Sequence, residues 1–284
     1  MSIKILIYGG LGNQLFQFAF GESLRLSYKN LEIKYIDLTK YYSAKRVWEL
    51  GFLDIKPHKV SKREIISIFL KRILNSKINK YSHNLIYFGI LNDNQYDHIF
   101  EYLQNKRSFI IDGYWQSEKY FLNNKMKIKK ILKIKKKNPI NKKESNFEKV
   151  AVHIRLGDYI NTSKGRESHL VCDIEWYKKS INYLKEFNSE LKFTIFSDDK
   201  KIIESEFSDY KDLEIYDSDY SKSAYEDLYE MSNYDHFIIS NSSYSWWASY
   251  LGENKNTKII APKYWYKNVK TTQIPLFREN WIIL

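Results

Sequence analysis

In the second half of the chain, short apolar runs alternate with segments of helical periodicity. The runs have strand length, and the segments between them place apolar residues at helical spacing. Such alternation is typical of a parallel, doubly wound sheet with helices on both faces. The predicted strands are Val150–Ile154, Leu191–Phe196, Leu213–Tyr216, His236–Ile239 and Lys258–Ala261.

The helical segments have identifiable starts and ends. Asp173 is a suitable N-cap, and Tyr177, Ile181 and Leu184 follow it on one face. Further helices are predicted over 199–207, 223–231 and 243–251, and Gly252 follows the last where a C-terminal glycine is favoured.

Polar loops follow three of these strands: 155–158 after the first, 197–199 after the second and 240–245 after the fourth. Ligands of open parallel sheets bind outside the carboxyl ends of the strands. His153 and Arg155 alternate by two, which would point both to one side, and an arginine presents fixed donors suited to phosphate. A surface ion pair would explain Arg155 and Asp158 alone, but three polar loops on one edge predict a ligand site.

The loop 240–245 combines several hydroxyls with a helix start. Free backbone N–H groups and the helix dipole favour an anion there, although plain N-capping explains a single serine. We predict phosphate binding at this loop. The adjacent pair Trp246-Trp247 is predicted to pack in the core.

The acids of the second loop admit a metal site, because paired carboxylates can hold Mg²⁺ on a diphosphate. The spacing lacks a D-x-D arrangement, and Asp199 also suits the cap of the next helix. We favour Asp198 as an acceptor of hydrogen bonds from a ribose or a guanine edge.

A strand, a glycine turn and a helix open the chain: Ile3–Tyr8, then Gly9-Gly10-Leu11-Gly12-Asn13-Gln14, then Leu15–Leu26. The dinucleotide fingerprint fails, because its third glycine would fall on Leu15, and no P-loop lysine follows. The glycines still allow a ligand close to the backbone, and a tight turn without a ligand is an equal alternative.

Four segments are specific in combination: GGLGNQLFQFAFG, DGYWQSEKYF (112–121), HIRLGDY and SNSSYSWWASYL. Together, and in this order, they resemble the α-1,2-fucosyltransferases of glycosyltransferase family 11, from the first strand to about Leu251. Similarity to the protein O-fucosyltransferases is weaker. The resemblance implies an α/β fold of GT-B type, with two Rossmann-like domains facing across a cleft and GDP-fucose bound mainly by the C-terminal one. It also implies an inverting, metal-independent reaction.

On this basis we expect an N-terminal, acceptor-side domain over 1–145, with the tail 263–284 packing back onto it. The GDP-fucose-binding domain is expected over 146–262. The segment between Tyr41 and Asn105 matches nothing in the resemblance, so acceptor choice is expected to depend partly on it.

The resemblance and the strand ends together give the predicted site residues. The catalytic candidates are His153, Arg155, Asp158 and Glu118, the last of which follows the strand-like run 108–115 and also suits a helix start. A dissociative path without a protein base is the alternative. Donor-binding residues are Gly10, Gly12, Asn13, Gln14, Arg155, Ser197, Asp198, Asn241, Ser242, Ser243 and Ser245, and acceptor-binding residues are Tyr114, Trp115 and Gln116.

Cysteine and histidine usage limits the chemistry. The single cysteine, Cys172, excludes an intramolecular disulfide and fits a reducing compartment, and the histidines show no metal-ligand spacing. We therefore expect no metal and no cofactor, with GDP-fucose as a co-substrate. The 284 residues suffice for two modest domains, and neither a bilayer-spanning stretch nor a signal peptide is recognisable, which predicts a cytoplasmic bacterial enzyme.

The net charge of +12 is concentrated in Lys125–Lys143, where lysines alternate with apolar residues. A solvated face or linker is the ordinary interpretation, and contact with an anionic membrane, near lipid-linked glycans, is the sharper one. A basic nucleic-acid-binding protein is the non-enzymatic alternative, but no nucleic-acid-binding motif supports it, so no nucleic acid is expected.

The sequence thus predicts transfer of L-fucose from GDP-fucose to the 2-hydroxyl of a terminal galactose in a glycan. Another GDP-sugar transferase, or a protein O-fucosyltransferase on the same fold, is the alternative.

Overall fold

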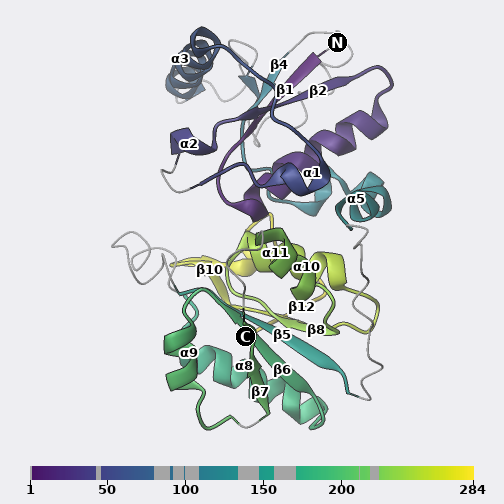
Figure 1. Cartoon of the computed structure of the whole chain (residues 1–284), viewed down its shortest axis with the longest axis vertical. Helices are drawn as coiled ribbons and strands as arrows, with labels where there is room; N and C mark the ends of the chain where they lie inside the picture. The colour runs from purple at the N-terminus through teal and green to yellow at the C-terminus, as the bar shows by residue number, and fades with distance from the viewer. Residues whose placement is uncertain are drawn as a thin grey trace. The chain divides into compact units, whose positions relative to one another are not determined.

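The computed structural model of the chain describes residues 2–42, 46–79, 90–91, 99, 109–133, 147–156, 171–210, 212–217 and 224–284. The chain divides into two compact units, Met1–Leu132 and Lys133–Leu284. Each unit is built around its own parallel sheet (Figure 1). The domain boundary expected at 145–146 falls among residues outside the described ones.

The sheet of the first unit has the order β2-β1-β4-β3, and all its strands run parallel. The strand predicted over Ile3–Tyr8 is confirmed, whereas the run 108–115 forms only a three-residue strand before the chain turns. The strands are β1 (Ser2–Ile7), β2 (Glu32–Asp37), β3 (Ile90–Leu91) and β4 (Phe109–Ile111). The helices are α1 (Leu11–Ser27), α2 (Thr39–Tyr42), α3 (Lys62–Asn79) and α5 (Lys125–Leu132), with 3-10 turns η1 (Leu50–Leu53), η3 (Glu118–Tyr120) and η4 (Leu122–Asn124).

Two helices, α1 and α3, cover opposite faces of this sheet, as the period of two along β1 requires. On one face the side chain of Ile5 lies against α1, where a Cβ on Gly21 would meet it at 2.5 Å. On the other face Leu6 and Tyr8 share a core with Ile68 of α3. The first unit is therefore doubly wound.

The predicted helix after the glycine turn begins four residues early, at Leu11. Gly10 is its N-cap, with an extended backbone, and its carbonyl accepts the N–H groups of Asn13 and Gln14. Gly12, Asn13 and Gln14 therefore lie in the first turn of α1, not in a loop before it.

The sheet of the second unit has the order β12-β9-β8-β5-β6-β7, which confirms the predicted parallel strands. The strands are β5 (Lys149–Ile154), β6 (Lys192–Ser197), β7 (Leu213–Ile215), β8 (His236–Ile238), β9 (Ile259–Ala261) and β12 (Trp281–Ile283). The helices are α8 (Ile174–Phe187), α9 (Lys200–Glu206), α10 (Ala224–Met231) and α11 (Ser243–Gly252). A small antiparallel pair, β10 (Tyr264–Tyr266) and β11 (Val269–Lys270), precedes the 3-10 turn η5 (Thr271–Gln273).

Helices also cover both faces of this second sheet (Figure 1). Val150 and Val152 of β5 share a core with the predicted apolar face of α8, and Asp173 caps that helix by accepting from the backbone N–H of Trp176. On the opposite face, Trp246 and Trp247 of α11 are fully buried, which confirms their predicted packing role.

The C-terminal tail belongs to the second unit. β12 pairs in parallel with β9, and the N–H of Leu284 donates to the carbonyl of Ala261 at 3.1 Å. This corrects the expectation that residues 263–284 pack back onto the first domain. The apolar run Trp281–Ile283 instead forms an edge strand of the second unit's sheet, next to β9.

Gly252 has a different role from the one predicted. It is the last residue of α11, and a Cβ built on it would lie 2.3 Å from the carbonyl oxygen of Ser232. The glycine permits close packing of α11 against the chain after α10, and it lies within the helix, whereas the sequence placed it just after the helix end.

Within the described ranges, none of the helices combines the length and the apolar character needed to cross a membrane.

Candidate functional site

The three polar loops predicted to form a site follow adjacent strands of the second unit. β5 lies between β6 and β8, and all three run parallel, so their carboxyl ends meet at one edge of the sheet. The loops bring Arg155, Asp198 and Ser240 to this edge, which we call the donor edge after the donor site predicted there.

Asp198 joins the first two loops. One carboxylate oxygen accepts the backbone N–H of Leu156 at 3.0 Å, and the other lies 3.6 Å from Nε of Arg155. The Arg155 side chain remains partly exposed. The carboxylate therefore orients the arginine at the end of β5, and the predicted contact of Asp198 with ribose or guanine stays a prediction.

His153 joins the first and third loops. Its Nδ1 lies 2.8 Å from the Ser240 hydroxyl, and its ring packs against Tyr244 at 5.4 Å between centroids. Burial, with a smaller contribution from the charge of Arg155, lowers the pKa of His153 from 6.5 to about 3, and Asp198 only partly opposes this. The imidazole is therefore neutral at physiological pH, and the positive charge of this pair rests on Arg155.

The two side chains at the end of β5 thus bind different neighbours. His153 is still part of β5 and reaches the loop after β8, whereas Arg155 lies one residue beyond the strand and reaches the loop after β6.

The serine loop contains two kinds of residue. Ser242 is the N-cap of α11, accepting the backbone N–H of Tyr244 at 3.3 Å, and both Ser242 and Ser243 are partly exposed. Ser245 and Asn241 are buried: the Ser245 hydroxyl donates to the Ser240 carbonyl at 3.4 Å, and the Asn241 amide donates to the Trp265 carbonyl at 2.9 Å. Ser242 therefore acts as an N-cap, as the alternative interpretation of the serines predicted. The buried Asn241 and Ser245 hold the conformation of the loop.

Asp199 caps α9, accepting the backbone N–H of Ile202 at 3.3 Å, as its alternative interpretation predicted. The Ser197 hydroxyl accepts the N–H of Asp199 at 3.1 Å. In the part of the chain that the structure describes, no group of three or more His, Cys, Asp or Glu residues is arranged to hold a metal ion. The metal-free reaction stays a prediction, and Asp158 lies outside the described residues.

In the first unit, the glycine motif and the DGYWQ motif meet at the carboxyl edge of the sheet. The Gln116 amide donates to the Asn13 side-chain oxygen at 2.6 Å. Gly9 adopts a positive φ of 82°, and a Cβ there would come within 2.7 Å of the Asn13 amide nitrogen. The turn therefore requires a glycine at position 9, next to the predicted Gly10.

Gln14 is fully buried, and its side chain binds backbone groups. Its amide donates to the carbonyls of Gly9 and Val47 at 2.9 and 2.8 Å and accepts the N–H of Glu49 at 2.9 Å. The side chain thus fastens the glycine turn to the segment before η1, and a direct donor contact stays a prediction.

The predicted acceptor residues point in different directions. Tyr114 is exposed and Gln116 partly so, whereas the Trp115 ring is fully buried and stacks on Phe20 at 4.3 Å. Trp115 adopts a positive φ of 54°, a strained conformation for a bulky residue. This turn buries one aromatic ring and leaves its two neighbours at the surface.

Glu118 starts η3 and forms an ion pair with Lys125 at 3.0 Å. The helix-start placement that the sequence suggested is therefore confirmed. Its role as a base is not tested by this geometry.

Sequence reasoning missed a buried cluster beside the DGYWQ motif. Arg72 of α3 donates through Nε and Nη2 to the Asp112 carboxylate at 2.6 and 2.9 Å, and the Tyr8 hydroxyl donates to Asp112 at 3.0 Å. Asp112 directly follows β4 within the DGYWQ motif, so the sequence could have indicated its importance. Arg72 gave no such indication, because its partner lies 40 residues further along the chain.

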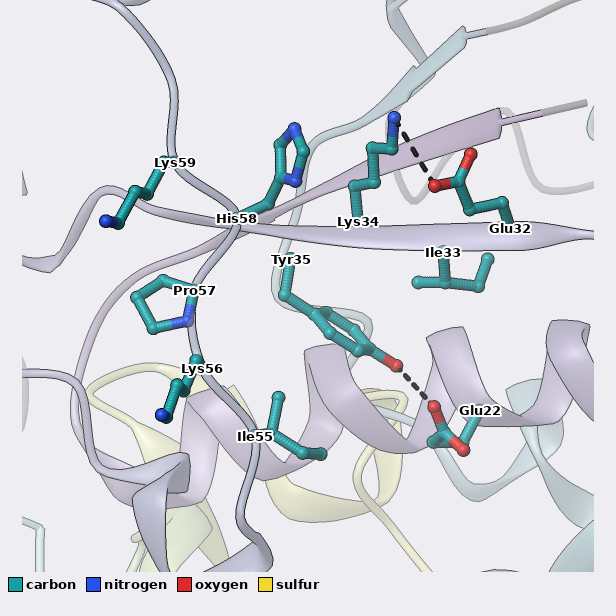
Figure 2. Close-up of a pocket in the computed structure, with 10 residues that line it drawn as sticks. All are labelled: Glu22, Glu32, Ile33, Lys34, Tyr35, Ile55, Lys56, Pro57, His58 and Lys59. Atoms are coloured by element: carbon teal, nitrogen blue, oxygen red, sulfur yellow. Dashed lines mark hydrogen bonds and ion pairs between the residues drawn. The ribbon is translucent and has the colours of Figure 1, made fainter.

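A surface pocket of about 570 Å³ lies elsewhere in the first unit. It is lined by the edge strand β2, by residues 55–59 and by Glu22 of α1, whose carboxylate accepts the Tyr35 hydroxyl at 2.9 Å (Figure 2). No predicted site residue that the structure describes lines it, so it is separate from the candidate site.

Comparison with known proteins identifies the family. The model of glycosyl transferase family 11 matches residues 2–284. The chain belongs to this family. It is 32% identical to an alpha-1,2-colitosyltransferase of Escherichia coli over 99% of each chain. It is also 28% identical to a galactoside 2-alpha-L-fucosyltransferase of Caenorhabditis elegans, over 54% of this chain and 45% of that protein.

The fold has a counterpart among solved structures. The E. coli ADP-heptose lipopolysaccharide heptosyltransferase II aligns with a TM-score of 0.50 and 8% identity, covering 100% of this chain and 90% of that one. The predicted GT-B class is confirmed, and so is the identification of the protein as a family 11 glycosyltransferase.

Proposed function

We propose that this glycosyltransferase moves L-fucose from GDP-fucose to the 2-hydroxyl of a terminal galactose, with inversion at the sugar. The observation that carries the proposal is Arg155 at the donor edge, held by Asp198 beside a neutral His153. A permanent cation at this position suits the diphosphate of a nucleotide sugar.

Arg155 would act on the departing diphosphate. Negative charge grows there as the bond to fucose breaks, so a fixed guanidinium stabilises the transition state more than the ground state. The α11 start at Ser242 and Ser243 adds backbone N–H groups and the positive end of a helix dipole.

The geometry leaves more than one candidate for the base that accepts the proton of the acceptor hydroxyl. A general base is most effective with a pKa near the operating pH, and the pKa of His153 is lowered to about 3. The lowered pKa favours His153 as a neutral hydrogen-bonding partner. Asp158, Glu118 and a dissociative path without a protein base remain the candidates.

A second donor is favoured by one observation. An alpha-1,2-colitosyltransferase is among the relatives that align over almost the whole chain, whereas the fucosyltransferase relative aligns over about half of it. Colitose is fucose without its 3-hydroxyl, so GDP-colitose and GDP-fucose present the same diphosphate to Arg155. The two donors differ only at that hydroxyl, so only protein groups that contact it can distinguish them.

One experiment separates these possibilities. The full chain is incubated with equal concentrations of GDP-fucose or GDP-colitose and with separate acceptors, namely galactose-terminated disaccharides, other disaccharides and serine- or threonine-containing peptides, and the product linkage is determined by NMR. We expect fucose on the 2-hydroxyl of galactose and a higher kcat/KM for GDP-fucose. A higher kcat/KM for GDP-colitose would make GDP-colitose the donor in place of GDP-fucose. Transfer only to peptides or to other sugars would rule out galactose as the acceptor.

A further inference from the structure

Over residues 62–73, where its side chains are described, the helix α3 buries only one of its sides. Ile68 is buried in the core with Leu6, and Arg72 is held by Asp112. The opposite side carries Ile66, Leu70 and Ile73, which are 59%, 55% and 52% exposed. Their i, i+4, i+7 spacing places them in one line, which we call the α3 stripe.

Basic residues flank the α3 stripe. At 100° per residue, Lys62 and Arg63 fall on either side of its centre, and both are exposed. Glu64, the single acidic residue in the sequence of α3, is turned away and pairs with Lys4 of β1 at 2.5 Å. The exposed side of α3 is therefore apolar along its middle and positively charged at its margins.

The exposed charge continues in the chain that enters α3. Lys56 and Lys59 are exposed, and in Figure 2 their side chains point away from Tyr35 and Glu22. Two further cations thus precede the basic first turn of the helix.

The lysine-rich segment Lys125–Lys143 offers less apolar surface than its sequence suggests. In α5, Ile128 and Leu132 are fully buried and pack within the first unit. Within its described part, Met126 is the exposed large apolar residue of the segment, Leu122 is exposed just before it, and residues 134–143 lie outside the described part.

We propose that the α3 stripe and its flanking cations dock on the surface of an anionic lipid bilayer. An amphipathic helix with a basic margin lies in the plane of the membrane, with its apolar side chains at the boundary between headgroups and acyl chains. Lysine and arginine near the surface add attraction to anionic headgroups. The helix α3 lies on the outside of its sheet in the first unit (Figure 1), as such contact requires.

The charge pattern favours a bilayer over a second copy of the chain. In a two-fold contact the same patch would face itself. Lys62 and Arg63 of one copy would then add like charge to an interface without a facing carboxylate from the exposed side of α3, and like charges across an interface are unfavourable.

Vesicle flotation with the full chain tests this proposal. Phosphatidylcholine vesicles with and without phosphatidylglycerol are compared for the wild type, for Ile66→Ser/Leu70→Ser/Ile73→Ser and for the matched control Leu122→Ser/Met126→Ser. We expect binding only to the anionic vesicles, weakened about tenfold or more in the stripe variant and retained in the control. Lys62→Glu/Arg63→Glu should also weaken binding and reduce its dependence on salt.

Further measurements keep the outcomes distinct. All substituted side chains are exposed, so the thermal unfolding midpoints should match the wild type, and transfer to a free disaccharide should not change. Equal binding by the wild type and the stripe variant, or no binding by the wild type, would overturn the proposal. A wild-type dimer that the stripe variant dissociates would also overturn it, in favour of self-association. A failure of the proposed sugar specificity would leave the vesicle result unaffected.

Discussion

His153 and Arg155 are two residues apart, yet burial gives them different electrostatic states. The imidazole is buried against Ser240 and Tyr244 and is kept neutral, whereas the guanidinium lies partly in solvent beside Asp198. An arginine keeps its charge in either setting, and a histidine does not. The donor edge thus pairs a fixed cation with a neutral hydrogen-bonding ring.

Replacing Arg155 by alanine should lower kcat by about 10²–10³, the usual effect of removing one electrostatic donor from a transition state. Arg155→Lys should restore little, because an ammonium group cannot reproduce the planar fork of donors. Steady-state kinetics with GDP-fucose measures both variants. Near-normal turnover by a correctly folded Arg155→Ala protein would remove this residue from the site.

The lowered pKa of His153 predicts a loss of stability in mild acid. Between pH 6.5 and about 3, the unfolded chain binds a proton on this residue and the folded protein does not. The free energy of unfolding therefore falls as pH decreases through this window, by up to about 1.4 kcal/mol per pH unit for one group. Urea unfolding between about pH 7 and 5 measures the slope above the range in which most carboxylates titrate.

The variant His153→Asn is the control for that slope. It cannot take up the proton, so its stability should change less with pH than that of the wild type, even if its stability at neutral pH is lower. Identical slopes would show that another group is responsible.

At the scale of elements, the end of α11 depends on close packing. A Cβ at position 252 would meet the Ser232 backbone oxygen at 2.3 Å, and a backbone atom cannot move aside as the end of a flexible side chain does. Gly252→Ala should therefore destabilise the protein by about 1–3 kcal/mol, although alanine ordinarily favours a helix.

Gly51→Ala is the matched control, because a Cβ at that position would meet nothing within 4 Å. Its effect should stay within about 0.5 kcal/mol. Chemical denaturation of both variants measures the difference, and equal stabilities would contradict the role assigned to Gly252.

At the scale of the whole molecule, we predict that the proposed reaction needs no bound metal. If Arg155 and the start of α11 balance the charge of the diphosphate, transfer should continue in excess EDTA at an unchanged rate. Activity that EDTA abolishes and Mn²⁺ restores would instead assign Asp198 a role as a metal ligand. The assay uses the full chain with GDP-fucose and a galactose-terminated disaccharide.

Most of the second unit was predictable because its signals are local. Asp173 and Asp199 cap their helices through neighbours three residues away, and the apolar runs of β5, β6 and β8 have strand length. Parallel pairing of such runs follows from the helices between them, and it brings the polar loops to one edge. The family was predictable from four motifs in a fixed order.

The sequence by itself therefore determined the fold class, the first strand of the chain, five strands of the second sheet, the caps Asp173 and Asp199, and the loops that form the donor edge. Only the tertiary structure decided which groups meet and what burial does to them. The pairing of Arg72 with Asp112, the edge position of β12 and the contact that makes Gly252 necessary join segments far apart in the chain. The neutral state of His153 depends on desolvation, and the exposed α3 stripe depends on which side of a helix the sheet covers. Local patterns do not contain these properties, because each arises from the surroundings that folding assembles.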